Sequence, residues 1–117
     1  MILDRDCYGI TISANVIAHE LGGGVDLRDA WGCAVSANTF TLMHQFGVRV
    51  GKNSGRITIT GNTFTGMSRE AVKSTGQCEH ILVLENIFHD PSRRSEKKLP
   101  AVSLPEALKT IIKDNLK

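Results

Sequence analysis

The sequence lacks the features of a membrane-spanning or nucleic-acid-binding chain. No uninterrupted apolar run approaches the roughly 20 residues that cross a bilayer, and the first residues have neither the basic start nor the apolar run of a signal peptide. The formal net charge is only +2 over 117 residues, which gives no electrostatic reason to expect nucleic acid. We therefore expect one domain with no nucleic-acid or membrane partner. Its compartment stays open, extracellular or periplasmic if it belongs to a longer exported chain.

Cysteine and recognisable catalytic motifs are also scarce. The three cysteines form no C-x-x-C pair and stand in or just before expected strands, so we interpret them as small buried hydrophobes and expect no disulfide framework. The sequence contains no G-x-S-x-G, H-E-x-x-H, phosphate-binding glycine loop or paired Cys/His spacing. We expect no cofactor, with a bound Ca²⁺ as the one alternative considered.

What the sequence does contain is a repeat. An I-x-I-x-x-N-x-[IF]-like octapeptide occurs four times, at residues 10–17, 33–40, 57–64 and 81–88, and its asparagines Asn15, Asn38, Asn62 and Asn86 are 23, 24 and 24 residues apart. A fixed period of this length is typical of a stacked repeat protein. The apolar residues alternate up to each asparagine and resume two places after it, which predicts a strand, a sharp corner and a second strand. We expect the asparagine to adopt the left-handed conformation, and the stacked amides to form a ladder.

A second motif adds a third strand to each repeat. Gly24-Val25-Asp26-Leu27 recurs at residues 47–50 and, more weakly, at 71–74. Three short strands in 23 to 24 residues predict a right-handed parallel β-helix of four rungs over residues 1–91. Its expected interior columns are Ile10/Cys33/Ile57/Ile81, Ile12/Val35/Ile59/Val83, Ile17/Phe40/Phe64/Phe88 and Val25/Val48/Val72. The alternative is a leucine-rich repeat, but the preference for Ile, Val and Phe and the extra strand favour the β-helix.

These motifs resemble the repeats of the right-handed parallel β-helix superfamily, the pectate-lyase-like and carbohydrate-binding β-helix proteins, over residues 1 to about 90. The resemblance implies a polysaccharide or glycan partner, bound along the face of the first strand of each rung and its bordering loops. It leaves enzymatic activity open because lyases, hydrolases and non-catalytic proteins share the fold. An enzyme would be a polysaccharide lyase or glycoside hydrolase. The alternatives are an adhesin- or tailspike-like scaffold and a leucine-rich-repeat interaction module.

The chain beyond residue 91 departs from the repeat. Residues 92–102 are expected to form a polar linker, and residues 103–117 an amphipathic helix with capping-box spacing between Ser103 and Glu106. The helix would cover the last rung with the apolar face Leu104, Leu108, Ile111, Ile112 and Leu116. No comparable cap precedes the first rung. We therefore expect either the C-terminal part of a longer β-helix or self-association through the open N-terminal rung.

One candidate ligand site lies on the outer face of the Gly-Val strands. If the valines point inward, Asp26, Arg49 and Lys73 point outward in one column. A carboxylate beside two cations suits an acidic glycan, with Arg49 at its centre; the alternative is an ordinary surface charge ladder. His44, Arg49 and Lys73 are the candidate catalytic residues, His44 as a general acid or base.

A second candidate site lies in the turn before each asparagine-bearing strand. Asp6, Asp29, Asn53 and Gln77 stand nine residues before their asparagines. Asp6 and Asp29 are candidate Ca²⁺ ligands, although neighbouring arginines explain the pair without a metal and we predict no metal site. Tyr8 and Trp31 stand seven residues before theirs, where Trp31 is a candidate for holding a sugar ring or for packing under the turn.

Overall fold

The chain folds into a stack of short parallel strands. The computed structural model describes residues 1–18, 23–89 and 100–116, with the side chains of residues 4–6 excepted. Every strand pair in this part of the chain is parallel. The strands are β1 (Ile2–Tyr8), β2 (Thr11–Ser13), β3 (Val16–Ala18), β4 (Val25–Trp31), β5 (Ala34–Ser36), β6 (Thr39–Thr41), β7 (Val48–Val50), β8 (Gly55–Thr60), β9 (Thr63–Thr65), β10 (Val72–Ser74), β11 (Cys78–Leu84), β12 (Ile87–His89), β13 (Val102–Ser103), β14 (Ala107–Leu108) and β15 (Ile111–Lys113).

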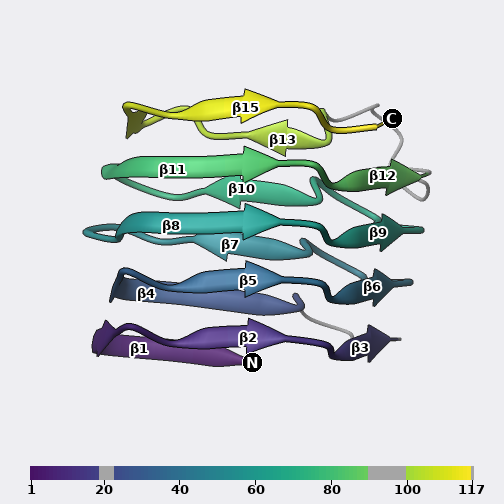
Figure 1. Ribbon diagram of the computed structural model, residues 1–117, viewed down its shortest axis with the longest axis horizontal. Coiled ribbons are helices and arrows are strands. Elements are labelled where there is room, and N and C mark those ends of the chain that lie inside the picture. The colour runs from purple at the N-terminus through teal and green to yellow at the C-terminus, as the bar shows by residue number, and fades with distance from the viewer. Residues whose placement is uncertain (19–22, 90–99, 117) are drawn as a thin grey trace.

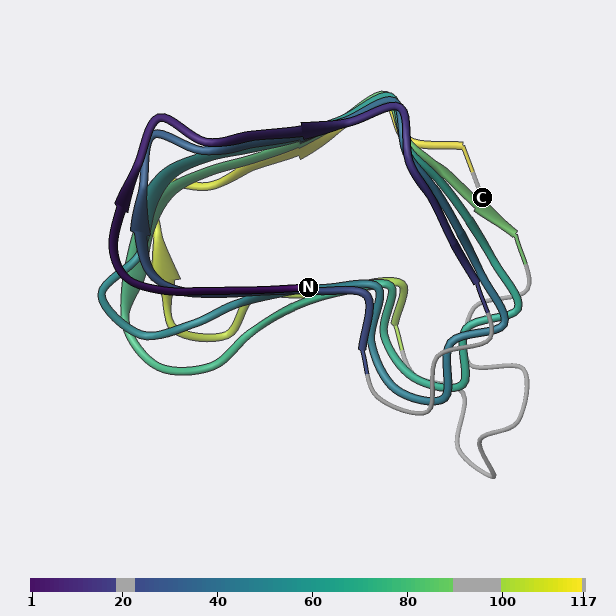
Figure 2. The same cartoon turned by 90° about the horizontal axis from the view of Figure 1, so that it is seen from below.

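Successive repeats lie on top of one another, so the predicted all-β parallel solenoid is confirmed. Figure 1 shows the layers rising from the N-terminal layer to the C-terminal one, and Figure 2, which looks along the stack, shows the repeats superposed around one closed outline. One sheet of four strands has the order β12-β9-β6-β3, and the other eleven strands form a single sheet that bends around the remaining sides. Among the described residues there is no helix of the length and apolarity needed to cross a membrane.

The interior consists of the predicted columns of like side chains. Val35 is in register with Ile12 below it and Ile59 above it, and Ile59 with Val83. In the smaller sheet the Phe40 and Phe64 rings stack with centroids 4.7 Å apart, and Phe64 and Phe88 with centroids 5.3 Å apart. The alternation of apolar and polar residues in each strand therefore places one side chain per layer in each column, and the core is built by repetition.

The asparagines form the predicted ladder, but the prediction of their backbone conformation is wrong. Nδ2 of Asn62 donates to Oδ1 of Asn86 at 3.0 Å, and Oδ1 of Asn62 accepts from Nδ2 of Asn38 at 3.0 Å. The left-handed residue is the one before each asparagine: φ is 58° at Ala14, 56° at Ala37, 66° at Gly61, 55° at Glu85 and 57° at Asp114. That sharp turn directs the following asparagine inward, where its amide satisfies backbone groups left unpaired by the corner.

The predicted C-terminal helix is wrong. Residues 102–113 contain β13, β14 and β15, which pair with β10 and β11 of the layer below. Ile112 lies in register with Val83, and Asn115 accepts a hydrogen bond from Nδ2 of Asn86 at 3.0 Å, so Asn115 is a fifth ladder residue. A helix would leave the strand edges of β10 and β11 unpaired, and pairing those backbone groups outweighs the helical spacing of the apolar residues.

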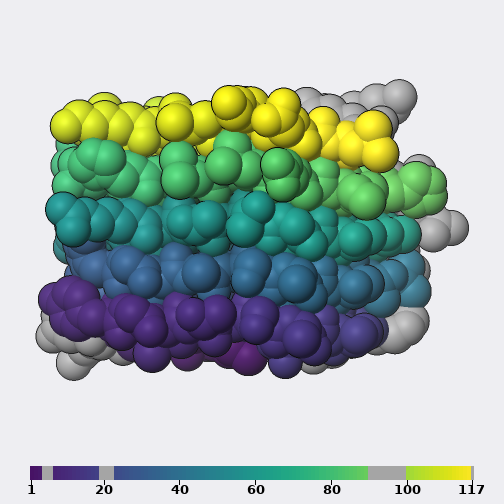
Figure 3. All heavy atoms as spheres, viewed as in Figure 1, coloured from purple at the N-terminus to yellow at the C-terminus, as the bar shows by residue number. Residues whose placement is uncertain are grey.

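Two further predictions change with this segment. The count of four rungs is wrong, because β13, β14 and β15 add a layer to the stack (Figure 3). Residues 92–99 of the predicted linker lie outside the described residues, and Val102 belongs to β13. The leucine-rich-repeat alternative is also wrong, because the described part of each repeat consists of strands and turns with no helix.

Candidate functional site

The predicted column of Asp26, Arg49 and Lys73 exists, but its carboxylate is already engaged. Asp26 in β4, Arg49 in β7 and Lys73 in β10 are successive neighbours in register. Asp26 is only 5% exposed. Arg49 makes a two-pronged interaction with it, from Nε to Oδ1 at 3.0 Å and from Nη2 to Oδ2, and Nε of Arg28 donates to Oδ2 at 3.0 Å. Both prongs of the Arg49 guanidinium face Asp26, which leaves no free fork for a ligand carboxylate.

The environment of Asp26 stabilises its charged form. Burial alone would raise the pKa of Asp26, but the hydrogen bonds from Arg49 and Arg28, together with their charges, lower it below its ordinary value. The hydrogen bond to Asp26 in turn raises the pKa of Arg49. The guanidinium carbon of Arg49 also lies 4.6 Å from the centre of the Phe46 ring, a cation–π geometry that fixes the side chain. This cluster joins the strands β4 and β7.

The other residues predicted for this site do not join the cluster. Lys73 makes no ion pair with any carboxylate within the described ranges. His44 is exposed in the segment between β6 and β7. The small pocket beside Asp26, of about 290 Å³, is lined by Gln45, Phe46 and Arg49 but not by His44. The structure therefore does not bring His44 and Arg49 together in one pocket.

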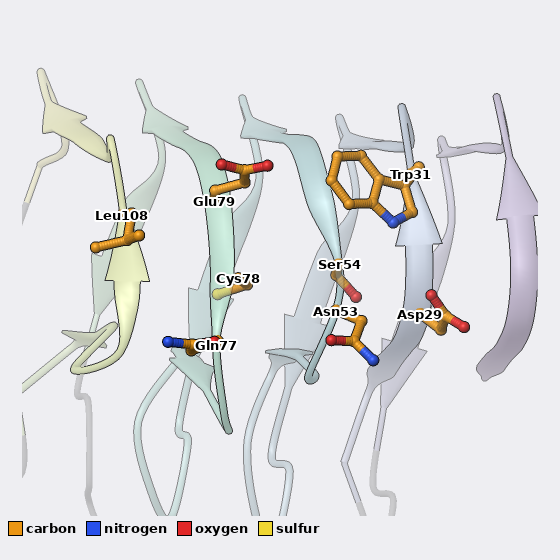
Figure 4. Close-up of a pocket in the computed structure, with 8 residues that line it drawn as sticks. All are labelled: Asp29, Trp31, Asn53, Ser54, Gln77, Cys78, Glu79 and Leu108. Carbon is orange, nitrogen blue, oxygen red and sulfur yellow. The ribbon is translucent and has the colours of Figure 1, made fainter.

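A larger groove crosses the turn before the asparagine-bearing strands. Its volume is about 440 Å³, and it is lined by Asp29, Trp31, Asn53, Ser54, Gln77, Cys78, Glu79 and Leu108. Figure 4 shows Trp31 and Glu79 along one side and Asp29, Asn53 and Gln77 along the other. An indole face and a row of amide and carboxylate groups thus border one open channel, which we call the turn groove.

Register explains why the turn groove exists. Trp31 at the end of β4 pairs with Gly55 of β8, Gly55 with Glu79 of β11, and Glu79 with Leu108 of β14. A side chain at Gly55 would lie 2.4 Å from Cζ3 of Trp31. The indole therefore occupies the space that a side chain at 55 would fill, and this single glycine gives the groove its aromatic wall. Tyr8, in register with Trp31, is 65% exposed on the next layer.

The groove also collects the predicted turn column. Asp29, Asn53 and Gln77, each nine residues before its asparagine, all line it. The side chain of Asp6 lies outside the described part of the chain, so its predicted pairing with Asp29 is not tested. No group of three His, Cys, Asp or Glu side chains able to hold a metal occurs among the described residues. Burial raises the pKa of Cys78, so this thiol at the groove floor stays protonated and weakly nucleophilic.

A basic strip borders the groove at the next corner. The residues six before each asparagine have positive φ: 64° at Gly9, 65° at Gly32, 52° at Arg56, 55° at His80 and 55° at Lys109. The first two layers use glycine, which adopts this conformation without strain, whereas the last three carry nitrogen-containing side chains at a conformational cost. Arg56, His80 and Lys109 line a common pocket of about 450 Å³. We call these three residues the basic corner.

Sequence reasoning missed Glu79, Leu108 and the basic corner, although a signal was present. Tyr8 and Trp31 stand seven residues before their asparagines, and the same count from Asn62, Asn86 and Asn115 gives Gly55, Glu79 and Leu108. Counting six gives the basic corner. The offset from the asparagine thus predicts each column, but Leu108 and Lys109 could be found only after Asn115 had been identified as a ladder residue.

Comparison with known proteins agrees with this architecture. A family model described as "Right handed beta helix region" matches residues 2–95. Neither the comparison with curated proteins nor that with solved structures gave a match. The matched segment contains four of the five ladder asparagines and most of the turn groove.

Proposed function

Because this chain belongs to the right-handed β-helix family, we propose that it binds carbohydrate, and that the ligand lies in the turn groove. The single observation that carries the proposal is the juxtaposition of the Trp31 indole with the side chains of Asp29, Asn53, Gln77 and Glu79 on successive layers. An aromatic face packs against the apolar C–H face of a sugar ring, and planar amides and carboxylates hydrogen-bond its hydroxyl groups. The groove crosses several layers, so it fits an oligosaccharide better than a single sugar.

The basic corner favours an acidic glycan over a neutral one. Arg56 and Lys109 flank His80 on consecutive layers at the border of the groove, where carboxylate or sulfate substituents of a bound chain would be paired with cations. Retaining arginine, histidine and lysine at positions where glycine would be unstrained supports a role for their side chains. The proposed ligand is therefore a uronate-containing or sulfated polysaccharide.

The first experiment tests the aromatic wall. Trp31 is the only tryptophan of the chain, so its fluorescence reports directly on the groove. We expect titration with polygalacturonate, alginate or a sulfated glycan oligosaccharide to change this fluorescence, and Trp31→Ala, assayed by calorimetry, to weaken binding about tenfold or more. Thr39→Ala, an exposed change on β6 in the other sheet, is the matched control and should bind like the parent. Absence of binding by the parent, or equal binding by Trp31→Ala, would refute the proposal.

The second experiment tests charge selection. Arg56→Gly installs the residue that the first two layers carry at the same corner, so the backbone should be kept. We expect this variant to lose affinity for the acidic oligosaccharides, with a weaker salt dependence, and to keep its affinity for a neutral oligosaccharide of equal length. Equal loss for both ligands would assign Arg56 a purely structural role. Reducing-end release and unsaturated-uronate absorbance, followed in the same samples, distinguish turnover from binding alone.

A non-catalytic scaffold is the second candidate function. The observation that favours it is the absence of any His, Cys, Asp or Glu triad suited to a metal within the described residues, combined with strand edges exposed at both ends of the stack. A binding module would show saturable glycan affinity in these assays, whereas a scaffold would show none.

A further inference from the structure

Both end layers of the stack expose strand edges. In the described part of the chain, β2 pairs only with β5 and β3 only with β6, while β15 pairs only with β11. Each layer between them is hydrogen-bonded on both sides. The two ends therefore present backbone donors and acceptors in the geometry that one layer uses to bind the next.

The inward-pointing side chains are uncovered at the same two ends. Ile10 is 40% exposed, whereas Cys33 above it in the same column is 2% exposed. At the other end Ile112 is 47% exposed, whereas Val83 below it is fully buried. Apolar side chains that complete a column in the middle of the stack thus face solvent at its ends, where covering them would be favourable.

The asparagine ladder gives the two ends opposite hydrogen-bonding character. In each step the backbone N–H and the amide Nδ2 of one asparagine donate to Oδ1 of the asparagine in the next layer, from Asn15 through to Asn115. At the N-terminal end, Oδ1 of Asn15 has no donor among the described residues. At the C-terminal end, Asn115 accepts from Asn86, and its backbone N–H has no acceptor in the same set. One end is an acceptor and the other a donor.

From this polarity we infer that copies of this chain associate head to tail, with the C-terminal layer of one copy on the N-terminal layer of another. The contact continues the ladder from Asn115 to Asn15 of the second copy and places Ile112 over Ile12. Pairing of two N-terminal ends would set acceptor against acceptor, so the expectation of association through the N-terminal rung alone is replaced. A contact between unlike surfaces gives an open chain of copies, and it does not depend on carbohydrate binding.

Two blocked variants test the inference on the full chain. Ile112→Lys places a charge at the C-terminal end and Ile10→Lys at the N-terminal end, both at half-exposed positions from which a lysine reaches water. We expect the parent to show concentration-dependent association by sedimentation velocity and each variant alone to be monomeric. An equimolar mixture of the two should form 1:1 dimers and nothing larger, because each variant keeps the end that the other lacks.

Every other outcome overturns the inference. A parent that stays monomeric up to its solubility limit excludes association, and a dimer of Ile112→Lys alone indicates N-terminal ends in contact. A dimer of Ile10→Lys alone indicates C-terminal ends. Circular dichroism and the melting midpoint verify that both variants fold. Val16→Lys and Leu116→Lys, at outward positions 75% and 65% exposed in one column at opposite ends, provide a second pair that leaves the interior unchanged.

Discussion

The five asparagines are the polar residues on which the corners depend, and their surroundings differ with position. Asn62 is 1% exposed; its Nδ2 donates to Oδ1 of Asn86 and to the carbonyl of Val35. Its Oδ1 accepts from the backbone N–H and Nδ2 of Asn38. Asn15 makes comparable donations, but its Oδ1 accepts none from the described residues. A ladder residue in the middle of the stack therefore satisfies more buried groups than one at the end.

We expect Asn62→Ala to lower the free energy of unfolding by roughly 1–3 kcal/mol, because buried donors and acceptors lose their partners. Asn15→Ala, the matched control at the end of the ladder, should cost less. Urea unfolding of both variants and the parent measures the difference. Equal costs at the two positions would show that the ladder adds nothing beyond the local corner.

The Asp26 cluster makes stability depend on pH in a defined direction. The pKa of Asp26 is below its ordinary value, which is about 4 in an unfolded chain. The ion pairs with Arg49 and Arg28 are therefore fully present above that pH and are lost as the pH falls through the lower folded-state value. We expect Asp26→Asn to be less stable than the parent at neutral pH, by roughly 1.5–3 kcal/mol, and the difference to shrink below about pH 4. Denaturant midpoints across this range measure it, and parallel curves for the two proteins would contradict it.

At the level of single residues, the sequence supports columns better than contacts. Alternation placed Asp26, Arg49 and Lys73 in register, as the structure has them. It could not show that Arg28, two residues along β4, turns back onto Asp26, because that depends on side-chain conformation. The left-handed residue could not be assigned to the position before the asparagine, since the positions there include alanine and glutamate, which rarely adopt positive φ.

At the level of elements, position in the stack decides how much each strand contributes. Ile59 of β8 is completely buried between Val35 and Val83, whereas Ile112 of β15 has a neighbour on one side only. The same side chain in the same column thus contributes differently.

We expect Ile59→Ala to cost about 2–5 kcal/mol, the range for a buried large-to-small change. Ile112→Ala should cost less than half as much, because nearly half of the side chain already contacts water in the single chain. Thermal or urea unfolding of the dilute protein provides the comparison. If Ile112→Ala proved as costly as Ile59→Ala, the last layer would have to be covered by some part of the molecule.

The C-terminal strands show where element prediction from sequence fails. Leu104, Leu108, Ile111 and Ile112 have helical spacing, and Ser103 with Glu106 has capping-box spacing. The competing evidence was the resemblance of Ala101-Val102-Ser103 to Ala71-Val72-Lys73 and the return of an asparagine at 115. The interval of 29 residues between Asn86 and Asn115 breaks the period of 23 to 24 and conceals this relation. Local helix propensity was outweighed by a strand edge that becomes visible only once the preceding layer has folded.

For the whole molecule, a stack in which each layer contacts only its neighbours should open from its ends. Stability in such an array is close to a sum of terms within and between adjacent layers, so the central layer has the most support. We expect amide hydrogen exchange by mass spectrometry to be slowest in β8 and faster in β2 and β15. Dilution below the association range should accelerate exchange in β2 and β15 but not in β8. Uniform protection along the chain would indicate all-or-none opening.

The whole fold was predictable because a repeat states the same information four times, and one mistaken repeat does not change the answer. The functional groove was predictable only in part. Trp31 and Asp29 stood out by residue type and offset, but the space for the indole comes from Gly55, whose role appears when two layers are superposed. A site built between layers depends on pairs of residues that no single repeat contains.

The ladder has one further physical consequence. Neighbouring strand dipoles largely cancel in a sheet, whereas the five asparagine amides all point the same way along the stack. Their dipoles add, with the negative end at the first layer and the positive end at the last. Each amide polarises the next, so every added layer strengthens those already present. The stack therefore behaves electrically as an oriented rod, and a longer rod holds each of its own layers more firmly than a short one.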